Sequence, residues 1–237
     1  MNNRSIRYPR GKTLGGSSSI NGLLWIRGQS NDYNNWRQMG NNGWGWNDVL
    51  PYFLKSENNE LGKSEYHNDS GPIMVSNKKI DLKMLDEFQN AAEECGIPKT
   101  KDFNTGDNTG IGFFQFTTNH NKSLLKLRCS AAKGYLNPVK KRKNLKIITD
   151  AHVQKINFKG TKADSVSFYR GDKVVTSKAR KEIILSAGSI GSPHILQVSG
   201  IGNADKLSKI GIKTIHELKG VGMNLQDHLM FRPVYKV

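Results

Sequence analysis

Residues 181–202, KEIILSAGSIGSPHILQVSGIG, carry the pattern that decides the fold class of this chain. The aliphatic run IIL at 183–185 indicates a strand with both faces buried, which is typical of a parallel strand in the centre of a sheet. Ser192 can cap a helix whose first position suits Pro193, and Gly200 can end that helix. A strand, a glycine-rich turn and a short helix form the unit of an open α/β sheet, whose ligands bind beyond the carboxyl end of the strand.

Further strands are predicted on both sides of the chain's middle. Residues 145–177 contain four short β-rich stretches, LKIIT, HVQKINF, DSVSFYR and KVVTS, which are separated by glycine or charged turns. This spacing predicts an antiparallel meander. The stretches GPIMVS at 71–76 and GIGFFQFTTN at 110–119 also predict strands.

Two segments predict helices. Residues 46–57 begin with Asn47 as a capping residue and place Pro51 near the first turn, where a missing N–H is best tolerated. Residues 81–95 show the clearest amphipathic period, and Asp81 starts them. The apolar face of this second helix consists of Leu82, Leu85, Phe88 and Ala92.

A second unusual stretch, PRGKTLGGSSSING at 9–22, gathers glycines and serines directly before the apolar residues 23–26. Glycines allow backbone N–H groups to approach a ligand closely, and serines at a helix start add donors where the helix dipole favours an anion. Gly15, Gly16 and Ser17 are therefore candidates to contact a phosphate or the polar edge of a flat heterocycle. The same composition fits a tight turn before a buried helix, and the residues alone leave both interpretations open.

The charge of the chain bears on its partners. Its 237 residues have a formal net charge of +16, from 36 Lys and Arg against 20 Asp and Glu. Such a charge permits a non-catalytic basic module that binds nucleic acid or an anionic surface. The basic residues are scattered, and the densest run, VKKRKN at 139–144, lacks the alternating aromatic residues of a single-strand-binding groove. We therefore expect no nucleic-acid partner, while peripheral membrane association stays open.

Cysteine and histidine spacing predicts no metal site. Cys95 and Cys129 form no C-x-x-C pair, and none of the six histidines stands in a zinc-binding spacing. The start, MNNRSIRYPRG, has no apolar segment of a secretory signal, and no apolar run approaches the ~18 residues that span a bilayer. The expected location is the reducing cytoplasm, with membrane association as the alternative.

Local motifs predict no catalytic residue. The sequence contains neither G-x-G-x-x-G nor a P-loop, since GVGMNL at 220–225 lacks the third glycine. His228 has Asp227 beside it, but adjacent side chains seldom face each other, so local hydrogen bonding is the expected role. Ser192 and Ser199 lack G-x-S-x-G and a matching base. The expected set of catalytic residues is therefore empty.

Four motifs in order resemble those of the glucose-methanol-choline (GMC) oxidoreductases. PRGKTLGGSSSINGLLWIRG at 9–28 resembles the first signature of this family, and GSIGSPHILQVSGIG at 188–202 resembles the second. Between them, residues 129–158 are similar to the segment that leads to the adenine-contacting strand, and residues 218–229 are similar to a further family stretch. The resemblance covers essentially the whole chain and is strongest to bacterial choline and alcohol dehydrogenases.

The resemblance implies a flavoprotein that oxidises a primary alcohol, such as choline or an aliphatic alcohol, by hydride transfer to N5 of FAD. Oxygen or a quinone would accept the electrons. The implied fold is α/β (mixed α+β), with part of a Rossmann-like FAD-binding domain and part of an antiparallel substrate sheet. Some members carry a flavin-linking histidine where this chain has Ile20, so FAD is expected to bind non-covalently.

The resemblance also implies which residues contact FAD. The expected contacts in the first motif are Gly15, Gly16, Ser17, Asn21, Gly22, Leu23 and Leu24. Among them, Asn21 and Gly22 would approach the isoalloxazine ring, and the apolar run that follows would anchor the loop in the core. Val153 would hold the adenine end through its backbone, and Ala187 and Gly188 would lie near the adenosine.

The implied domain order is discontinuous. Residues 1–60 are expected to belong to the FAD-binding domain, 61–125 to a partial substrate domain, 126–228 again to the FAD-binding domain, and 229–237 to the start of a truncated substrate domain. Family members carry an N-terminal G-x-G-x-x-G segment and a C-terminal catalytic histidine region, and this sequence shows neither. The expectation is an internal fragment that is inactive alone. A lyase that retains FAD is a further alternative.

Overall fold

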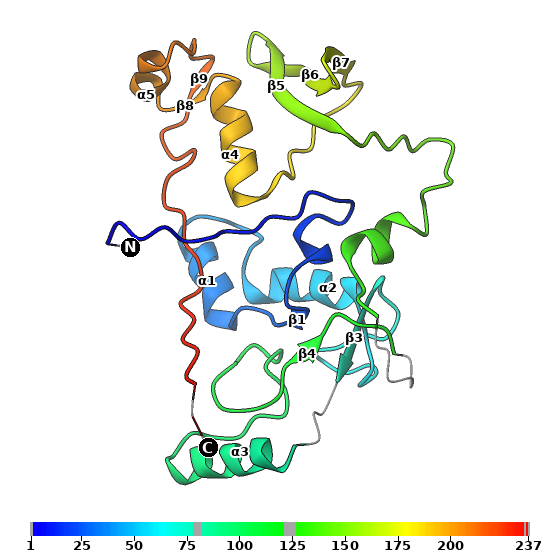
Figure 1. Cartoon of the computed structure of the whole chain (residues 1–237), viewed down its shortest axis with the longest axis vertical. Coiled ribbons are helices and arrows are strands. Elements are labelled where there is room, and N and C mark those ends of the chain that lie inside the picture. The colour runs from blue at the N-terminus through cyan, green and yellow to red at the C-terminus, as the bar shows by residue number, and fades with distance from the viewer. Residues whose placement is uncertain (1, 78–81, 121–126, 235, 237) are drawn as a thin grey trace. The chain divides into compact units, whose positions relative to one another are not determined.

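The computed structural model describes residues 2–77, 82–120, 127–234 and 236, which gather into two compact units (Figure 1). The first unit is Met1–Lys146 and the second is Ile147–Val237. The units reflect internal contacts, and the expected assignment of segments to FAD and substrate domains stays a prediction. Within the described residues, no helix combines the length and the apolar character needed to cross a membrane.

Aromatic packing holds together the first two α-helices of the first unit. These helices are α1 (Ser30–Gln38) and α2 (Trp46–Ser56). The ring of Tyr33 lies 5.8 Å from that of Trp46 and 5.7 Å from that of Phe53, measured between centroids. Such tilted and edge-on pairs stabilise beyond the area that they bury, so a residue of α1 anchors both ends of α2.

The helix predicted at 46–57 is confirmed, but its cap is not the expected one. Gly45 is the N-cap, and its backbone N–H donates to Asp48 Oδ2 at 3.0 Å, so Asn47 lies inside the helix. Pro51 consequently sits more than one turn into α2 rather than near its start. The carboxylate at the third helical position satisfies the helix end, which explains why the local capping signal at Asn47 was misleading.

The amphipathic helix predicted at 81–95 is confirmed as α3, Lys83–Glu94. Its expected first residue, Asp81, lies outside the described residues. Its apolar face is not buried, because Leu82 is 57% and Phe88 is 50% exposed. The period of the sequence therefore predicted the helix correctly, while the burial of its apolar face did not follow.

A small mixed sheet forms the centre of the first unit. Its strands are β1 (Leu24–Trp25), β2 (Glu57–Asn59), β3 (Ile73–Asn77) and β4 (Gln115–Phe116), in the order β1-β4-β3-β2. Pairs β1–β4 and β3–β4 are antiparallel, and β2 runs parallel to β3. Ile73, Val75 and Cys129 form the buried core beside this sheet, with Trp25 and Met74 packed against it.

The strand predictions for this sheet were right in one place and too long in another. The strand at 71–76 is confirmed as β3, whereas only Gln115–Phe116 of residues 110–119 forms a strand. Outside it, Ile111 makes a single bridge to Lys99. The expected anchoring of the run 23–26 is also wrong in part, since Leu24 and Ile26 are 46% and 45% exposed. Alternating exposure is the normal result of strand pleating with one buried face.

An antiparallel meander forms the sheet of the second unit (Figure 1). Its strands are β5 (Ala151–Lys159), β6 (Lys162–Arg170) and β7 (Lys173–Lys178), in sequence order. These confirm three of the four predicted strands. The fourth, LKIIT at 145–149, forms no strand, and Ile147 and Ile148 are 39% and 40% exposed. Its β propensity is high, but it makes no ladder with another strand.

The central parallel strand predicted at 181–188 is wrong. The segment is irregular, and Ile184 is 79% exposed instead of buried on both faces. No strand among the described residues pairs with it. A strand needs a neighbour to take up its backbone hydrogen bonds, so three consecutive aliphatic residues do not form one by themselves.

The helix predicted after this segment is confirmed as α4, Gly188–Val198, although it starts five residues earlier than the predicted first residue, Pro193. Ser192 lies inside α4, where its Oγ accepts a hydrogen bond from the N–H of Ala187 at 3.0 Å. Gly200 follows the helix with φ +89°, a left-handed conformation suited to glycine. The remaining elements of the second unit are α5 (Ala204–Lys209) and the parallel pair β8 (Ile201–Gly202) and β9 (His216–Glu217). The first unit also contains the short helix η2 (Ala132–Leu136).

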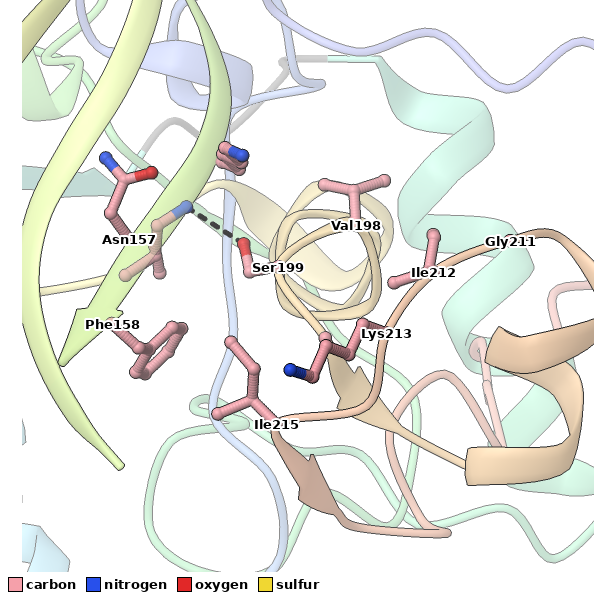
Figure 2. A pocket seen from close by; sticks show the side chains of 11 residues that line it. Asn157, Phe158, Val198, Ser199, Gly211, Ile212, Lys213 and Ile215 are labelled. Carbon is pink, nitrogen blue, oxygen red and sulfur yellow. Dashed lines mark hydrogen bonds between the residues drawn. The ribbon is translucent and has the colours of Figure 1, made fainter. Parts of the chain in front are cut away.

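The end of α4 is fastened to β5 by one buried hydroxyl. Figure 2 shows the side chain of Ser199 turned toward β5, where its Oγ accepts a hydrogen bond from the backbone N of Ile156 at 2.9 Å. The same hydroxyl donates to the carbonyl of Ile195 at 2.5 Å. Ser199 is 5% exposed and Ile156 is 6% exposed, so water does not readily replace the hydroxyl.

We expect Ser199→Ala to lower the free energy of unfolding by about 1–3 kcal/mol, because a buried backbone N–H loses its partner. The matched control is Ser208→Ala, whose exposed hydroxyl donates only to the carbonyl of Asp205, and it should change the stability by less than about 0.5 kcal/mol. Urea denaturation followed by circular dichroism measures both. Equal effects of the two substitutions would contradict the buried role of Ser199.

Candidate functional site

The glycine- and serine-rich stretch forms a compact loop in the first unit. It contains the short 3₁₀ helix η1, Gly16–Ser19, which follows Gly15 at φ +92° and begins with Gly16 at φ +56°. The N–H of Gly16 donates to the carbonyl of Thr13 at 2.9 Å. Two consecutive left-handed residues are accessible mainly to glycine, so the double glycine is required by the turn itself.

The serine hydroxyls of this loop bind its own backbone. Ser17 Oγ accepts from the N–H of Gly11 at 3.2 Å, Ser18 Oγ donates to the carbonyl of Gly15 at 2.6 Å, and Ser19 Oγ donates to the carbonyl of Leu14 at 2.9 Å. Ser18 Oγ also accepts from the N–H of Ala131 at 2.9 Å. The hydroxyls therefore shape the loop and fix it to the following segment of the unit.

Arg128 clamps the end of the loop. Its Nη1 lies 2.5 Å from Asn21 Oδ1 and 3.1 Å from the carbonyl of Ser18, and its Nη2 donates to the carbonyl of Asn21 at 2.7 Å. A guanidinium offers several donors in one rigid plane, so it can hold a side chain and the backbone together. Our motif comparison missed Arg128, although it directly precedes the similar segment 129–158.

The glycines of this loop differ in the space around them: Gly16 and Gly22 are open, and Gly11 is closely packed. No atom of the described residues lies within 4 Å of the position that a Cβ would take at Gly16 or at Gly22. At Gly11 a Cβ would stand 2.2 Å from the carbonyl oxygen of Gly16 and 2.6 Å from the N of Ser17. The loop thus presents bare backbone outward at Gly16 and Gly22, which is the arrangement that close approach of a large planar group requires.

A strained residue joins the loop to β1. Leu23 has φ +70°, and left-handed backbone at a leucine costs ~1–3 kcal/mol. Its N–H donates to Asn21 Oδ1 at 3.1 Å, and its carbonyl accepts from the N–H of Thr117 at 2.8 Å. Strain that surrounding contacts maintain is typical of functional loops, and here Asn21 and Thr117 maintain it.

The structure places the expected cofactor contacts in both units. The seven contacts of the first motif lie between Gly15 and Leu24, in the loop and at the start of β1 of the first unit. Val153 lies in β5, opposite Phe168, while Ala187 is the N-cap of α4 and Gly188 its first residue, with φ +84°. These three belong to the second unit, and each set is positioned within its own unit.

Behind the loop lies a buried cluster of charged and amide side chains. Glu57 is 0% exposed, and several donor groups surround its carboxylate. The carboxylate lies 2.9 Å from Arg27 Nη2, 2.8 Å from His67 Nδ1 and 3.0 Å from Trp25 Nε1. On its far side, His67 Nε2 lies 2.6 Å from Asp102 Oδ2. The ring of His67 is therefore held between two carboxylates, which favours its doubly protonated form.

Amide side chains tie this cluster to the sheet. Asn104 Oδ1 accepts from the N–H of Arg27 at 2.8 Å, and Asn104 Nδ2 donates to the carbonyl of Trp25 at 3.2 Å. Gln115 Oε1 accepts from Asn104 Nδ2 at 3.2 Å and from Asn59 Nδ2 at 3.1 Å. Buried polar groups are tolerated when they are hydrogen-bonded in this way.

The pKa values of the cluster follow from these contacts. Burial alone would lower the pKa of His67, but hydrogen bonds and charges from Asp102 and Glu57 outweigh it and raise the pKa from 6.5 to about 9. Burial would raise the pKa of Glu57, but His67 and Arg27 hold it below 4.5. The pKa of Asp102 is held below 3.8 against the effect of burial by His67 and the N–H of Asn104.

The second unit contains a pocket of about 460 Å³ between β5, the end of α4 and residues 211–215 (Figure 2). Its lining includes Phe158, Ile215 and Lys213. Val153, Ala187 and Gly188 are not among its lining residues. At the C-terminal side of this unit, Asp227 Oδ1 accepts from the backbone N–H of His228 at 2.9 Å.

Comparisons with known proteins assign this chain to one family. The family model for GMC oxidoreductases matches residues 1–230. An oxygen-dependent choline dehydrogenase of Pectobacterium atrosepticum is 42% identical over 231 residues, and the mitochondrial choline dehydrogenase of Homo sapiens is 41% identical over 229 residues. Each alignment covers 97% of this chain, but 41% of the first relative and 38% of the second.

Solved structures agree in fold. An FAD-dependent oxidoreductase from Chaetomium thermophilum matches with a TM-score of 0.89 and 35% identity, over 95% of this chain and 41% of the other. Pyridoxine 4-oxidase from Mesorbium loti matches with a TM-score of 0.80 and 28% identity, over 88% of this chain and 40% of the other. The chain belongs to the GMC oxidoreductase family, and its mixed α/β fold is that of FAD-dependent members. It spans about two fifths of the length of these relatives.

Proposed function

We propose that this chain supplies part of the FAD-binding body of an oxidoreductase that oxidises a primary alcohol, with choline as the leading candidate. The observation that carries the proposal is the loop at residues 11–22, which presents open glycine backbone outward in a member of a flavoprotein family. The relatives at 41–42% identity are choline dehydrogenases, and one of them is named as oxygen-dependent. They support choline as the donor and oxygen as the acceptor.

The loop residues would hold FAD mainly through main chain. Gly15, Gly16 and Ser17 would lie along the cofactor, Asn21 and Gly22 would approach the isoalloxazine ring, and Leu23 and Leu24 would complete this set. The remaining three contacts, Val153, Ala187 and Gly188, would bind the adenosine end. When bound, FAD supplies an acceptor for the hydride that leaves the alcohol carbon. The contribution of this chain is to bind and orient the cofactor, with Arg128 keeping Asn21 in place.

Ile20 indicates how the cofactor would be retained. It stands directly before Asn21 and has no nucleophilic atom, so we propose that FAD is bound non-covalently. We also propose that residues 1–60 and 126–228 belong to the FAD-binding domain, and that 61–125 and 229–237 belong to the substrate domain. The glycine loop lies in segment 1–60, and Val153, Ala187 and Gly188 lie in segment 126–228.

The test is purification of the polypeptide as its gene encodes it. We expect the two-banded visible absorbance of oxidised flavin and release of that flavin on acid precipitation. If the gene product also carries the catalytic histidine region, the absorbance should be lost when choline is added without oxygen. Arg128→Ala should weaken FAD binding by about 10- to 100-fold, since it removes hydrogen bonds to a charged group. The control Arg170→Ala, at an exposed position of β6, should leave binding unchanged. A purified protein without flavin affinity would overturn the proposal.

A further inference from the structure

The cluster behind the loop contains a histidine that the proposed function does not use. His67 is 5% exposed, and each of its ring nitrogens faces a carboxylate oxygen, at 2.8 Å for Glu57 and 2.6 Å for Asp102. A neutral imidazole has only one N–H, so it could donate to one of the two carboxylates alone. Both carboxylate contacts are satisfied together only when the ring carries two protons and a positive charge. Nδ1 also lies 3.0 Å from Asn59 Nδ2, an amide nitrogen that donates to Gln115 Oε1 at 3.1 Å.

The charges of the cluster balance only in that state. The ring of His67 contacts the carboxylates of Glu57 and Asp102, and Arg27 contacts that of Glu57. These three partners together carry one positive and two negative charges. A protonated His67 brings the sum to zero. The side chains of Arg27 and Glu57 are 2% and 0% exposed, so an unbalanced charge among them would be buried without water to stabilise it. Burial of these groups therefore favours the protonated form of His67.

The cluster is joined directly to the strand that ends the glycine loop. Glu57 Oε2, on the carboxylate that faces His67, accepts from Trp25 Nε1 at 3.0 Å, and Trp25 lies in β1. Arg27 Nη1 donates to the carbonyl of Tyr66 at 2.7 Å, beside His67. The Glu57 carboxylate that contacts His67 therefore also holds Trp25, and the backbone carbonyl next to His67 holds Arg27. Only Leu23 and Leu24 separate Trp25 from Gly22.

We propose that His67 is a positioning residue: as an imidazolium bridge between Glu57 and Asp102, it holds β1 and thereby the end of the glycine loop. The part that concerns FAD rests on the proposed function, whereas the bridge and its hold on Trp25 do not. When His67 loses this proton, Arg27 is the remaining cation beside the carboxylates of Glu57 and Asp102, and one N–H hydrogen bond of the ring is lost. The Glu57 carboxylate, which accepts from Trp25, is then held less firmly.

The direction of the pH dependence follows from the raised pKa of His67, about 9 in the folded protein against 6.5 as the ordinary value. The stabilisation by the bridge is complete below pH 6.5 and is lost as the pH rises through about 9. The groups that face the ring and its partners are Glu57 of β2, Asp102 and Arg27. Over this range the two carboxylates stay ionised, because their pKa values are lowered, so His67 is the member of the cluster that titrates.

The test follows the indole N–H of Trp25 by NMR in the protein without added flavin, with Trp25→Phe identifying the signal. We expect a shift with a midpoint near pH 9, the pKa of the bridge. The indole signal of Trp44, which is 54% exposed, should not shift and serves as the internal control. A Trp25 signal that stays constant through pH 9, or that titrates near 6.5, overturns the proposal and requires no variant.

Variants separate the bridge from the fold. His67→Gln is neutral, so the Trp25 transition should disappear, while the control His216→Gln, at an exposed position of β9, should retain it. Persistence of the transition in a folded His67→Gln protein would overturn the proposal. If His67→Gln does not fold, the wild-type midpoint decides by itself.

The flavin measurement distinguishes the two proposals. FAD affinity of the wild-type protein should fall by about tenfold as the pH rises through 9, the change that corresponds to one lost hydrogen bond. The His67→Gln protein should bind FAD more weakly than the wild type at neutral pH as well. If FAD never binds while Trp25 titrates near 9, the proposed function fails and the bridge stands. If FAD binds with an affinity that is indifferent to His67, the link from the bridge to the loop fails.

Discussion

Glu57→Ala is expected to lower the free energy of unfolding by about 3–5 kcal/mol, the cost of removing one partner from a buried charge pair. The side chain of Glu57 is 0% exposed, and that of its partner Arg27 is 2% exposed. The same carboxylate accepts from Trp25 Nε1 at 3.0 Å and from the N–H of Asn68 at 3.2 Å. Alanine would leave the guanidinium of Arg27 and the ring of His67 buried with too little negative charge.

The matched control is Glu93→Ala. Glu93 forms an ion pair with Lys99 at 2.7 Å, similar in length to the pairs of Glu57, but the two side chains are 56% and 38% exposed. Exposed pairs contribute about 0–1 kcal/mol, so this variant should stay close to the wild type. Urea unfolding monitored by tryptophan fluorescence measures both variants. A loss for Glu57→Ala no larger than that for Glu93→Ala would show that the cluster does not stabilise the fold.

The pH dependence of stability supplies a second readout of the same variant. The pKa values of Glu57 and Asp102 are held below 4.5 and 3.8 in the folded protein. Their stabilisation is therefore complete above these ordinary values and is lost as the pH falls through the lowered ones. Glu57→Ala should show a smaller loss of stability on acidification than the wild type, because one of the two carboxylates is gone.

Gly71→Ala is expected to lower the free energy of unfolding by about 3 kcal/mol, since the substitution overpacks a site that cannot yield. A Cβ at Gly71 would stand 2.4 Å from the carbonyl oxygen of Glu57 and 2.5 Å from its N. Both contacts are to backbone, which cannot rotate away as a side chain does. The N–H of Gly71 also donates to the same carbonyl at 2.8 Å, so moving the chain apart would break that bond.

Gly220→Ala provides the comparison for this variant. Within the part of the chain that the structure describes, no atom lies within 4 Å of the Cβ position at Gly220, and the backbone of Gly220 is not left-handed. Alanine there should therefore change stability by less than about 0.5 kcal/mol. The midpoint of urea unfolding serves for both proteins. Because Gly71 presses on the backbone of Glu57, its alanine variant should also disturb the Trp25 indole signal, whereas Gly220→Ala should leave it unchanged. Equal stability of the two variants would contradict the close packing.

Local features of this chain were predictable because their causes lie within a few residues. The period of α3, the three strands of the meander and the left-handed Gly200 after α4 all depend on neighbours in sequence. The double glycine of the loop is of the same kind, since Gly15 and Gly16 adopt the left-handed backbone that glycine permits.

The buried cluster was beyond this reasoning. Its charged members stand at positions 27, 57, 67 and 102, and no spacing among them forms a motif. Chain topology brings them together, with β2 parallel to β3 and Arg27 following β1. Arg128 reaches Asn21 across more than a hundred residues for the same reason.

The sequence by itself determined the family, through four motifs in order, together with the positions of α2, α3 and α4 and the glycine loop. Tertiary structure alone decided which β-prone segments became strands and which charged groups were buried. Residues 181–188 have the composition of a central strand, but a strand exists only where a neighbour accepts its hydrogen bonds. Likewise, the charge on His67 depends on two carboxylates that are distant along the chain and adjacent only after folding.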